Sequence, residues 1–171
     1  MRVGVLTVSD RSAQGLREDR SGAVLRALIE AQGWQAARTG VVPDDRPTIE
    51  RTLVEWADSG EVDVILTTGG TGFSARDVTP EATLAVTERQ APGLAETIRA
   101  VGLRATPPAM LSRAVAGIRG QTLIVNLPGS PKAAQEGLEI ILPALPHAVA
   151  LLSGSPEAES GHRPPPQLKR L

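Results

Sequence analysis

The chain has 171 residues, of which 41% are hydrophobic and 22% charged, and its formal net charge is −1. This length predicts one domain with its own core, and the near-neutral charge argues against a nucleic-acid partner. The absence of cysteine excludes disulfides and thiolate metal sites. No apolar run approaches the ~20 residues of a membrane helix, and MRVGVLTVSD is too short for a signal peptide. We therefore expect a cytoplasmic protein with no membrane partner.

Two strands and one helix are predicted in the first quarter of the chain. Residues 3–8 are a short apolar run typical of a buried strand, and residues 34–42 predict a second, less regular strand. Between them, Ser21 can cap a helix that ends at Gly33, where a left-handed backbone is wanted. The segment SDR at residues 9–11 is expected to be a polar loop.

The next predicted helix begins near Asp44 or Asp45 and stops at Gly60. Residues 62–67 then form a third buried strand, which leads into a loop rich in glycine. A helix with Thr79 as its N-cap follows, since proline occupies the next position.

The second half of the chain is expected to hold another helix at residues 94–103. Residues 113–119 and 121–127 are two short runs that predict a strand pair. A turn then leads to a helix capped by Ser130, and residues 142–152 form the last predicted helix.

The C-terminal end differs in composition from the rest. Residues 154–171 are rich in proline and serine and lack periodicity, so we expect a flexible tail after a domain at residues 1–153. Within that domain, alternating strands and helices predict a layered α/β fold with a mainly parallel sheet. Ligands of such sheets bind outside the carboxyl ends of the strands, which is where loops 9–11, 69–77 and 126–131 would meet.

The glycine loop has the composition of an anion site. Glycines bring backbone N–H groups close to an anion and threonine hydroxyls add donors, although a tight turn without a ligand would use the same residues. Neither GxxxxGK[ST] nor GxGxxG is present, so a Walker-type or dinucleotide site is not expected. The candidate substrate-binding residues here are Thr68, Gly69, Gly70, Thr71 and Gly72.

Two aspartates are candidate catalytic residues and Mg²⁺ ligands. Asp77 follows the glycine loop, and Asp44 lies on another strand-to-helix turn. A carboxylate repels phosphate but suits Mg²⁺, which takes one or two carboxylates and completes its shell with water and phosphate oxygens. The alternative is that both aspartates only cap helices. Arg76, beside Asp77, is a candidate for binding the negatively charged substrate.

Two further loops carry candidate substrate-binding residues. In NLPGSPK, prolines stiffen the turn and a serine and a lysine can face an anion, although capping and solvation explain them equally. In SDR, the alternative is a plain loop with a surface ion pair. The candidates are Asn126, Pro128, Gly129, Ser130 and Lys132 in the first loop, and Ser9, Asp10 and Arg11 in the second.

The remaining aromatic and histidine residues carry little chemistry. Phe73 either stacks on a substrate ring or pins the glycine loop to the core, and Trp34 and Trp56 are expected in the core. His147 and His162 have no plausible partners in the sequence, so we expect neither a histidine triad nor a histidine metal site.

The motifs taken together resemble one known family. TTGGTG is followed by ARDVTPEAT, SDR and VPDD follow the first two strands, and NLPGSPK precedes a late helix. This combination resembles the molybdenum cofactor biosynthesis family over residues 2–153. Its nearest members are the MogA/MoaB-type molybdopterin adenylyltransferases and the related G domains of gephyrin.

The resemblance implies a fold, an activity and partners. It implies a three-layer α/β/α sandwich with one antiparallel strand, which the hairpin at residues 113–127 would supply, and a homotrimer or hexamer. It implies transfer of AMP from Mg-ATP to the terminal phosphate of molybdopterin, and hand-over of the product to a separate molybdenum-insertion protein. Asp44 and Asp77 match the family's two important aspartates, and the glycine and NLPGSP loops match its substrate-binding loops.

Two alternatives remain beside the adenylyltransferase. One is a non-catalytic MoaB-like paralog or carrier that binds molybdopterin without transfer. The other is a CinA-like nucleotide hydrolase, whose glycine loop has a similar architecture. The scarcity of general bases favours phosphoryl or nucleotidyl transfer, because an anionic attacking group needs only positioning and charge neutralisation.

Overall fold

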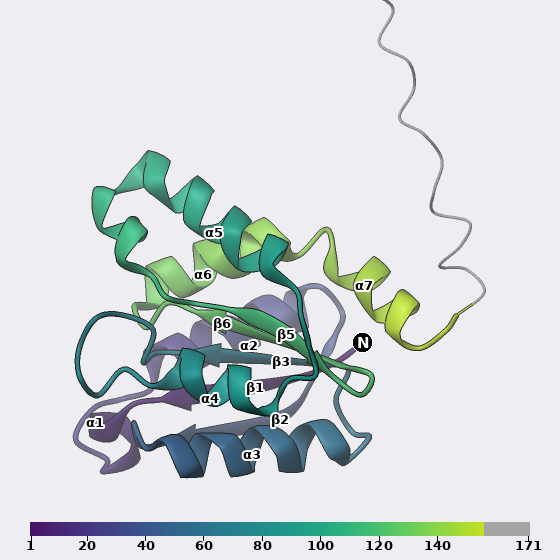
Figure 1. Cartoon of the computed structure of the whole chain (residues 1–171), viewed down its shortest axis with the longest axis horizontal. Coiled ribbons are helices and arrows are strands. Elements are labelled where there is room, and N and C mark those ends of the chain that lie inside the picture. The colour runs from purple at the N-terminus through teal and green to yellow at the C-terminus, as the bar shows by residue number, and fades with distance from the viewer. Residues whose placement is uncertain (156–171) are drawn as a thin grey trace, which may run out of the picture.

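A six-stranded sheet between two helical layers forms the centre of the molecule in the computed structural model, which describes residues 1–155 (Figure 1). The strand order is β2-β1-β3-β6-β5-β4. The first four are mutually parallel, and β5 is antiparallel to both of its neighbours. The strands are β1 (Arg2–Val8), β2 (Gln35–Val42), β3 (Val64–Thr68), β4 (Arg89–Gln90), β5 (Ala116–Arg119) and β6 (Thr122–Leu127). The predicted sandwich with one antiparallel strand is confirmed.

The central strands are buried on both faces. Every residue of β3 and β6 is buried, as is every residue of β1 after Arg2. Parallel strands covered by helices on both sides are expected to be continuous apolar runs rather than alternating ones. The register pairs Thr7 with Thr68, and Thr68 with Leu127. The carboxyl ends of the three strands therefore lie at one edge of the sheet.

Two hydrophobic clusters, one on each face of the sheet, hold the helices in place. Leu25 and Leu138 belong to one cluster, while Leu53 and Ala82 belong to the other. In Figure 1, α5 and α6 of one layer lie above the sheet and α3 of the other lies below it. The first layer contains α2 (Arg20–Ala31), α5 (Pro92–Ala105), α6 (Pro131–Ile141) and α7 (Leu145–Leu152); the second contains α3 (Arg46–Asp58) and α4 (Thr79–Val86).

Several helix starts differ from the prediction. Asp19, not Ser21, caps α2, and its carboxylate accepts from the Gly22 amide. The N-cap of α4 is Val78, because the Thr79 hydroxyl donates instead to the Gly69 carbonyl. α5 begins at Pro92, earlier than expected. The Thr79 hydroxyl thus contacts a residue that is distant in the sequence, and local capping preferences do not include such contacts.

The segment at residues 9–11 is also not a loop. Ser9 caps a one-turn helix, α1 (Asp10–Ala13), by accepting from the Ser12 amide. Ser130 caps α6 as predicted, and of the two aspartates expected near the start of α3, Asp45 is the cap. A short 3₁₀ helix, η1 (Pro107–Leu111), completes the elements.

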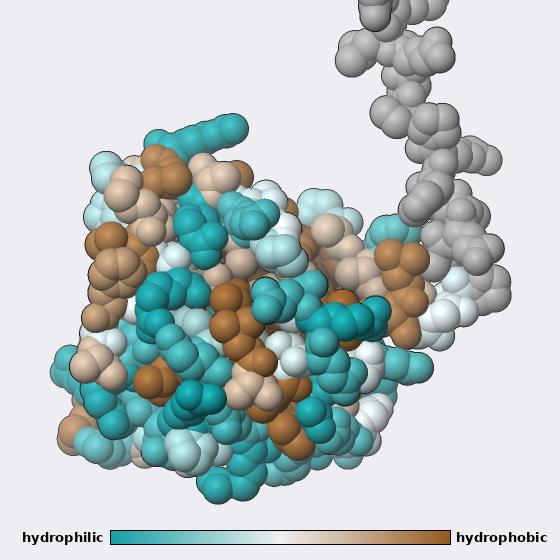
Figure 2. Space-filling model, viewed as in Figure 1, coloured by the Kyte–Doolittle hydropathy of each residue, from teal (hydrophilic) through white to brown (hydrophobic). Residues whose placement is uncertain are grey.

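Most of the predicted C-terminal tail, including His162, lies in residues 156–171, which are outside the residues that the structure describes. The domain boundary at residue 153 therefore stays a prediction. Within residues 1–155, no helix is long and apolar enough to cross a membrane. Figure 2 shows a surface on which hydrophilic residues surround small separate groups of hydrophobic ones.

Candidate functional site

A polar cavity of about 320 Å³ lies at the carboxyl edge of the sheet. The three loops predicted to meet there all contribute, since Ser9, Gly70 and Gly129 line it together. Asp44 and Asp77 line the same cavity. The other lining residues are Thr7, Val8, Ser12, Arg17, Glu18, Arg20, Ser21, Thr68, Gly69 and Ser130.

Backbone sterics account for the first two glycines of the loop. Gly69 has φ +100°, and a Cβ there would lie 2.3 Å from the carbonyl oxygen of Val8. Gly70 has φ +63°, and its Cβ would lie 2.3 Å from the Thr79 hydroxyl and 3.1 Å from the Asp44 carboxylate. Only glycine fits this left-handed turn. The turn brings the backbone against the end of β1 and directly beside a candidate carboxylate.

The glycine and NLPGSP loops contact each other. The Thr68 hydroxyl donates to the Pro128 carbonyl at 2.7 Å, and a Cβ on Gly129 would lie 3.1 Å from the Gly69 Cα. From the other side, the Ser21 hydroxyl donates to the Gly129 carbonyl at 3.2 Å. The floor of the cavity is thus built from backbone held at fixed spacing by side-chain hydroxyls.

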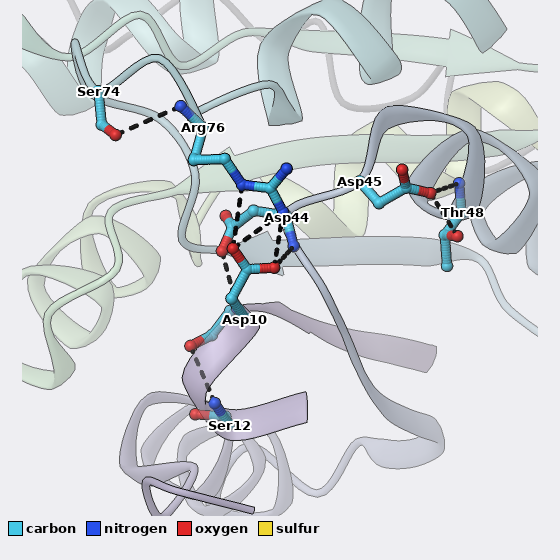
Figure 3. A network of polar contacts seen from close by, with 8 residues as sticks. Asp10, Ser12, Asp44, Asp45, Thr48, Ser74 and Arg76 are labelled. Atoms are coloured by element: carbon cyan, nitrogen blue, oxygen red, sulfur yellow. Dashed lines mark hydrogen bonds and ion pairs between the residues drawn. The ribbon is translucent and has the colours of Figure 1, made fainter. Parts of the chain in front are cut away.

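Asp10, Asp44 and Arg76 form a network across three separate segments (Figure 3). The amide of Asp10 donates to Asp44 Oδ2 at 2.8 Å, and the amide of Asp44 donates to Asp10 Oδ1 at 3.0 Å. Arg76 reaches over from the glycine loop and donates to both Asp10 oxygens, through Nη2 at 2.8 Å and Nε at 3.0 Å. The reciprocal bonds lock the ends of β1 and β2 together and join them to the loop.

The network leaves two carboxylates without an ion-pair partner among residues 1–155, Asp44 and Asp77. Arg76 holds the pKa of Asp10 below its usual range, chiefly by hydrogen bonding. The pKa of Asp44 is raised, first by burial and then by the negative charges of Asp10 and Asp77. A cation between Asp44 and Asp77 would relieve this repulsion.

The donor set fits Mg²⁺ rather than a transition metal. Within residues 1–155, no three acidic or histidine side chains are grouped as metal ligands. Two carboxylates in a polar cavity, with the remaining positions left to water and phosphate oxygens, are the ligands that Mg²⁺ prefers. Asp44 and Asp77 are the residues that would hold it.

Eight of the predicted substrate-binding residues do not line the polar cavity: Asp10, Arg11, Thr71, Gly72, Arg76, Asn126, Pro128 and Lys132. Asn126 is fully buried, and its amide donates to Thr67 at 2.9 Å and Thr83 at 2.8 Å, so it joins β6 to β3 and α4. The side chain of Lys132 is 87% exposed and lies 3.7 Å from Glu136. Arg11 is exposed on α1 and Asp10 faces Arg76, so neither lines the cavity.

A second, apolar cavity of about 310 Å³ adjoins the first. Thr71, Gly72 and Pro128 line it, next to the loop residues that line the polar cavity. Its other walls come from α5, η1 and one side of α6, from Ala133 to Ile140. The glycine loop therefore separates a polar cavity from an apolar one.

Sequence reasoning missed the start of α2. Arg17, Arg20 and Ser21 line the polar cavity, although Ser21 was interpreted only as a cap. The available signal was topological, because a helix that follows a parallel strand begins at the carboxyl edge of the sheet.

The three aromatic residues differ in their burial. Phe73 is 69% exposed and so does not pin the loop to the core. Trp56 is buried and Trp34 packs partly against the opposite cluster, as expected. Phe73 lines neither the polar nor the apolar cavity, but a separate hollow that it shares with Asp77 and Arg113. Stacking on a substrate ring stays the open alternative for Phe73.

Comparison with known proteins places this architecture in a family. The family of probable molybdopterin binding domains matches residues 4–147. A molybdopterin adenylyltransferase of Helicobacter pylori is 41% identical over 91% of this chain and 89% of its own, and that of Escherichia coli K12 is 38% identical over 96% and 94%. The molybdopterin biosynthesis enzyme MoaB of Thermus thermophilus is 53% identical over 91% of this chain and 98% of its own, with a TM-score of 0.85. The chain belongs to the molybdenum cofactor biosynthesis family of probable molybdopterin binding domains.

Proposed function

We propose that this protein is a molybdopterin adenylyltransferase that transfers AMP from Mg-ATP to the terminal phosphate of molybdopterin. The observation that carries the proposal is the polar cavity, which is lined by the glycine loop and by Asp44 and Asp77, two carboxylates without ion-pair partners among residues 1–155. The relatives that bear this name support it, because they match the chain over nearly its whole length.

The reaction requires neutralisation of negative phosphate charge rather than a strong base. A phosphate oxygen of molybdopterin attacks the α-phosphorus of ATP, the bond from that phosphorus to the β-phosphate oxygen breaks, and pyrophosphate leaves with the bonding electrons. The attacking oxygen is already anionic, so no proton has to be removed. Bound Mg²⁺ would neutralise phosphate charge and orient the oxygens.

The chain's own residues supply the rest of the binding. Amides of the glycine loop and the start of α6 present donors to phosphate oxygens, since helix N-termini carry partial positive charge. Arg17 adds positive charge to the lining of the cavity, where Arg20 is paired with Glu18. Arg76 holds Asp10 and thereby keeps the Asp44 backbone in place. These groups hold two polyanions close together, which is the main requirement of the step.

The two adjoining cavities suit two substrates. The polar one fits phosphates and metal, while the apolar one offers room for a planar ring. The glycine loop lies between them, so a bound ring and a bound phosphate would be separated only by that loop. This arrangement favours a bisubstrate transferase over a hydrolase that needs a single nucleotide.

The alternative is a non-catalytic MoaB-like paralog or carrier, although the 53% identical MoaB of Thermus thermophilus bears the name of an enzyme. Turnover separates the two. Purified protein is incubated with molybdopterin, ATP and Mg²⁺, and adenylylated pterin and pyrophosphate are quantified. Formation of both in equal amounts supports the transferase. Tight pterin binding without pyrophosphate supports the carrier, and ATP hydrolysis without pterin supports the CinA-like hydrolase.

A homotrimer, or a hexamer, and hand-over to a separate molybdenum-insertion protein belong to the same proposal. Large hydrophobic side chains are exposed along the end of α5 and on η1. They are Val101, Leu103, Met110 and Leu111. Such a group is typical of contact surfaces, and sedimentation equilibrium would measure the mass of the assembly.

A further inference from the structure

Arg113 binds the glycine loop from the side that faces away from the polar cavity. It lies just before β5, and its guanidinium donates to the carbonyl oxygens of Gly72, at 2.7 Å, and of Asp77. Its own amide donates to the Thr71 carbonyl at 2.9 Å. Asp77 lines both the polar cavity and the hollow on the other side of the loop, whereas Arg113 lines only that hollow. One side chain thus joins both ends of the segment that carries the candidate Mg²⁺ ligand.

Glu81 holds the guanidinium in this orientation. Arg113 Nη1 donates to Glu81 Oε1 on the first turn of α4, so all three guanidinium nitrogens have an acceptor. Among residues 1–155, Glu81 Oε2 is buried without a hydrogen-bond partner.

The Asp77 carboxylate depends on the shape of this segment. Its Oδ2 accepts from the Ser74 amide at 2.9 Å, and the Asp77 amide donates to the Ser74 carbonyl at 2.9 Å. A Cβ on Gly72 would lie 2.9 Å from the same Oδ2. Both ends of this tight turn are bonded to Arg113, so a change in their spacing would redirect the carboxylate.

We infer that Arg113, oriented by Glu81, is a positioning residue that sets the place of the Asp77 carboxylate, and hence of the metal and phosphate, in the proposed transfer. The inference rests on the proposed function for its catalytic consequence. Its structural part, the fixing of residues 72–77, does not.

The chain offers a matched control in Arg119, at the other end of β5. Its Nε and Nη2 donate to the two Asp58 oxygens at 2.8 and 2.7 Å, and Nη1 donates to the Val86 carbonyl at 3.1 Å. Like Arg113, Arg119 therefore donates to a carboxylate on a helix and to a backbone carbonyl. It does so at the amino edge of the sheet, where the parallel strands begin. Loss of either arginine removes similar stability, but only Arg113 touches the glycine loop.

The first experiment measures hydrogen–deuterium exchange in full-length wild type, Arg113→Gln and Arg119→Gln, and it does not depend on turnover. Peptides that span residues 72–77 should exchange faster in Arg113→Gln alone, while peptides from β1 and β3 stay protected in all three proteins. Equal exchange of the loop in both variants, or unchanged exchange in Arg113→Gln, would overturn the inference. Global loss of protection in Arg113→Gln would also overturn it, because the residue would then be a general support of the fold.

The second experiment tests the catalytic consequence by steady-state kinetics. A displaced Asp77 should lower kcat by about 100-fold, as small misplacements do, and raise the Mg²⁺ concentration for half-maximal rate, with the KM for ATP changed far less. Arg113→Lys should not restore the rate, because one ammonium cannot reproduce a planar fork of donors. Wild-type kinetics in Arg113→Gln would refute the catalytic consequence. Absence of transfer by wild type would refute the proposed function, leaving the exchange result to decide the positioning.

Discussion

The aspartates at the amino edge of the sheet differ from those at its carboxyl edge in their ion-pair partners and in their pKa values. At the amino edge, Asp63 pairs with Arg2 and Asp58 pairs with Arg119, and each arginine holds the pKa of its carboxyl below the usual range. At the carboxyl edge, Arg76 forms an ion pair with Asp10 but not with Asp44, whose pKa is raised. Both edges contain aspartates. Asp58 and Asp63 at the amino edge are paired with arginine, whereas Asp44 at the carboxyl edge has no such partner among the described residues.

The difference indicates which edge is built for stability and which for a ligand. Charges that are paired within the chain gain a little stability and need nothing else. Charges left together in a cavity lower stability until a cation arrives, and natural proteins accept such conflicts at functional sites. The predictions below test this division between the edges.

The largest effect is expected from removing a carboxylate at the carboxyl edge. Asp77→Asn and Asp44→Asn should each reduce transfer by about 10²–10³-fold, the scale for one electrostatic group in an active site. Thermal stability should stay level, since an amide oxygen still accepts the backbone bonds and repulsion is removed. Asp58→Asn at the amino edge is the control and should keep full turnover. Rates and melting temperatures measured together check the prediction, and an active Asp77→Asn would contradict the metal role.

The next effect concerns Gly72, where φ is not positive and only the Asp77 carboxylate obstructs a side chain. Gly72→Ala should push that carboxylate aside and lower kcat by about 10–100-fold through misplacement. The fold should remain intact, because a flexible side-chain end can move. Gly93→Ala, where nothing lies within 4 Å of a new Cβ, is the control. Kinetics of both variants with Mg²⁺ titration would show the difference, and equal kcat values would count against it.

Gly69 should respond in the opposite manner to Gly72. Its φ is +100°, and the methyl group of an alanine there would lie 2.3 Å from the Val8 carbonyl oxygen, so the substitution conflicts with the backbone itself. Gly69→Ala should lower the free energy of unfolding by more than ~1 kcal/mol, whatever the ligand. Urea denaturation without substrates measures this. Unchanged stability would mean that the glycine serves phosphate approach alone.

The smallest effect lies at the amino edge and depends on pH. Burial raises the pKa of Asp63, but hydrogen bonds from Arg2 outweigh burial, so the folded pKa lies below the unfolded one. The pair therefore stabilises the fold fully above the unfolded pKa, about 3.9, and this contribution is lost as pH falls through the folded pKa. Asp63→Asn should cost less than about 1 kcal/mol at pH 7, and the cost should vanish in acid. Denaturation at pH 7 and pH 3 measures it, and an equal cost at both would exclude the ionic origin.

Much of the fold was predictable because local patterns and tertiary structure agree. Apolar runs predict the central strands, Ser130 is the predicted cap of α6, and Gly33 and Gly60 end helices with positive φ. The glycine loop, the two aspartates and their meeting at one sheet edge followed from motif order and strand direction. Ser21 and Thr79 were misplaced because their hydroxyls bond to residues far along the chain, Gly129 and Gly69.

The sequence by itself determined the layered fold, the family and the pair of aspartates, since periodicity, turn chemistry and short motifs are local properties. Only the tertiary structure decided which neighbours each charge meets. It buried Asn126 between strands, moved Lys132 to the surface, and brought Arg17, Arg20 and Arg113 to the two sides of one loop. Side-chain partners across 30 or more residues depend on packing of distant elements, and no local pattern encodes those distances.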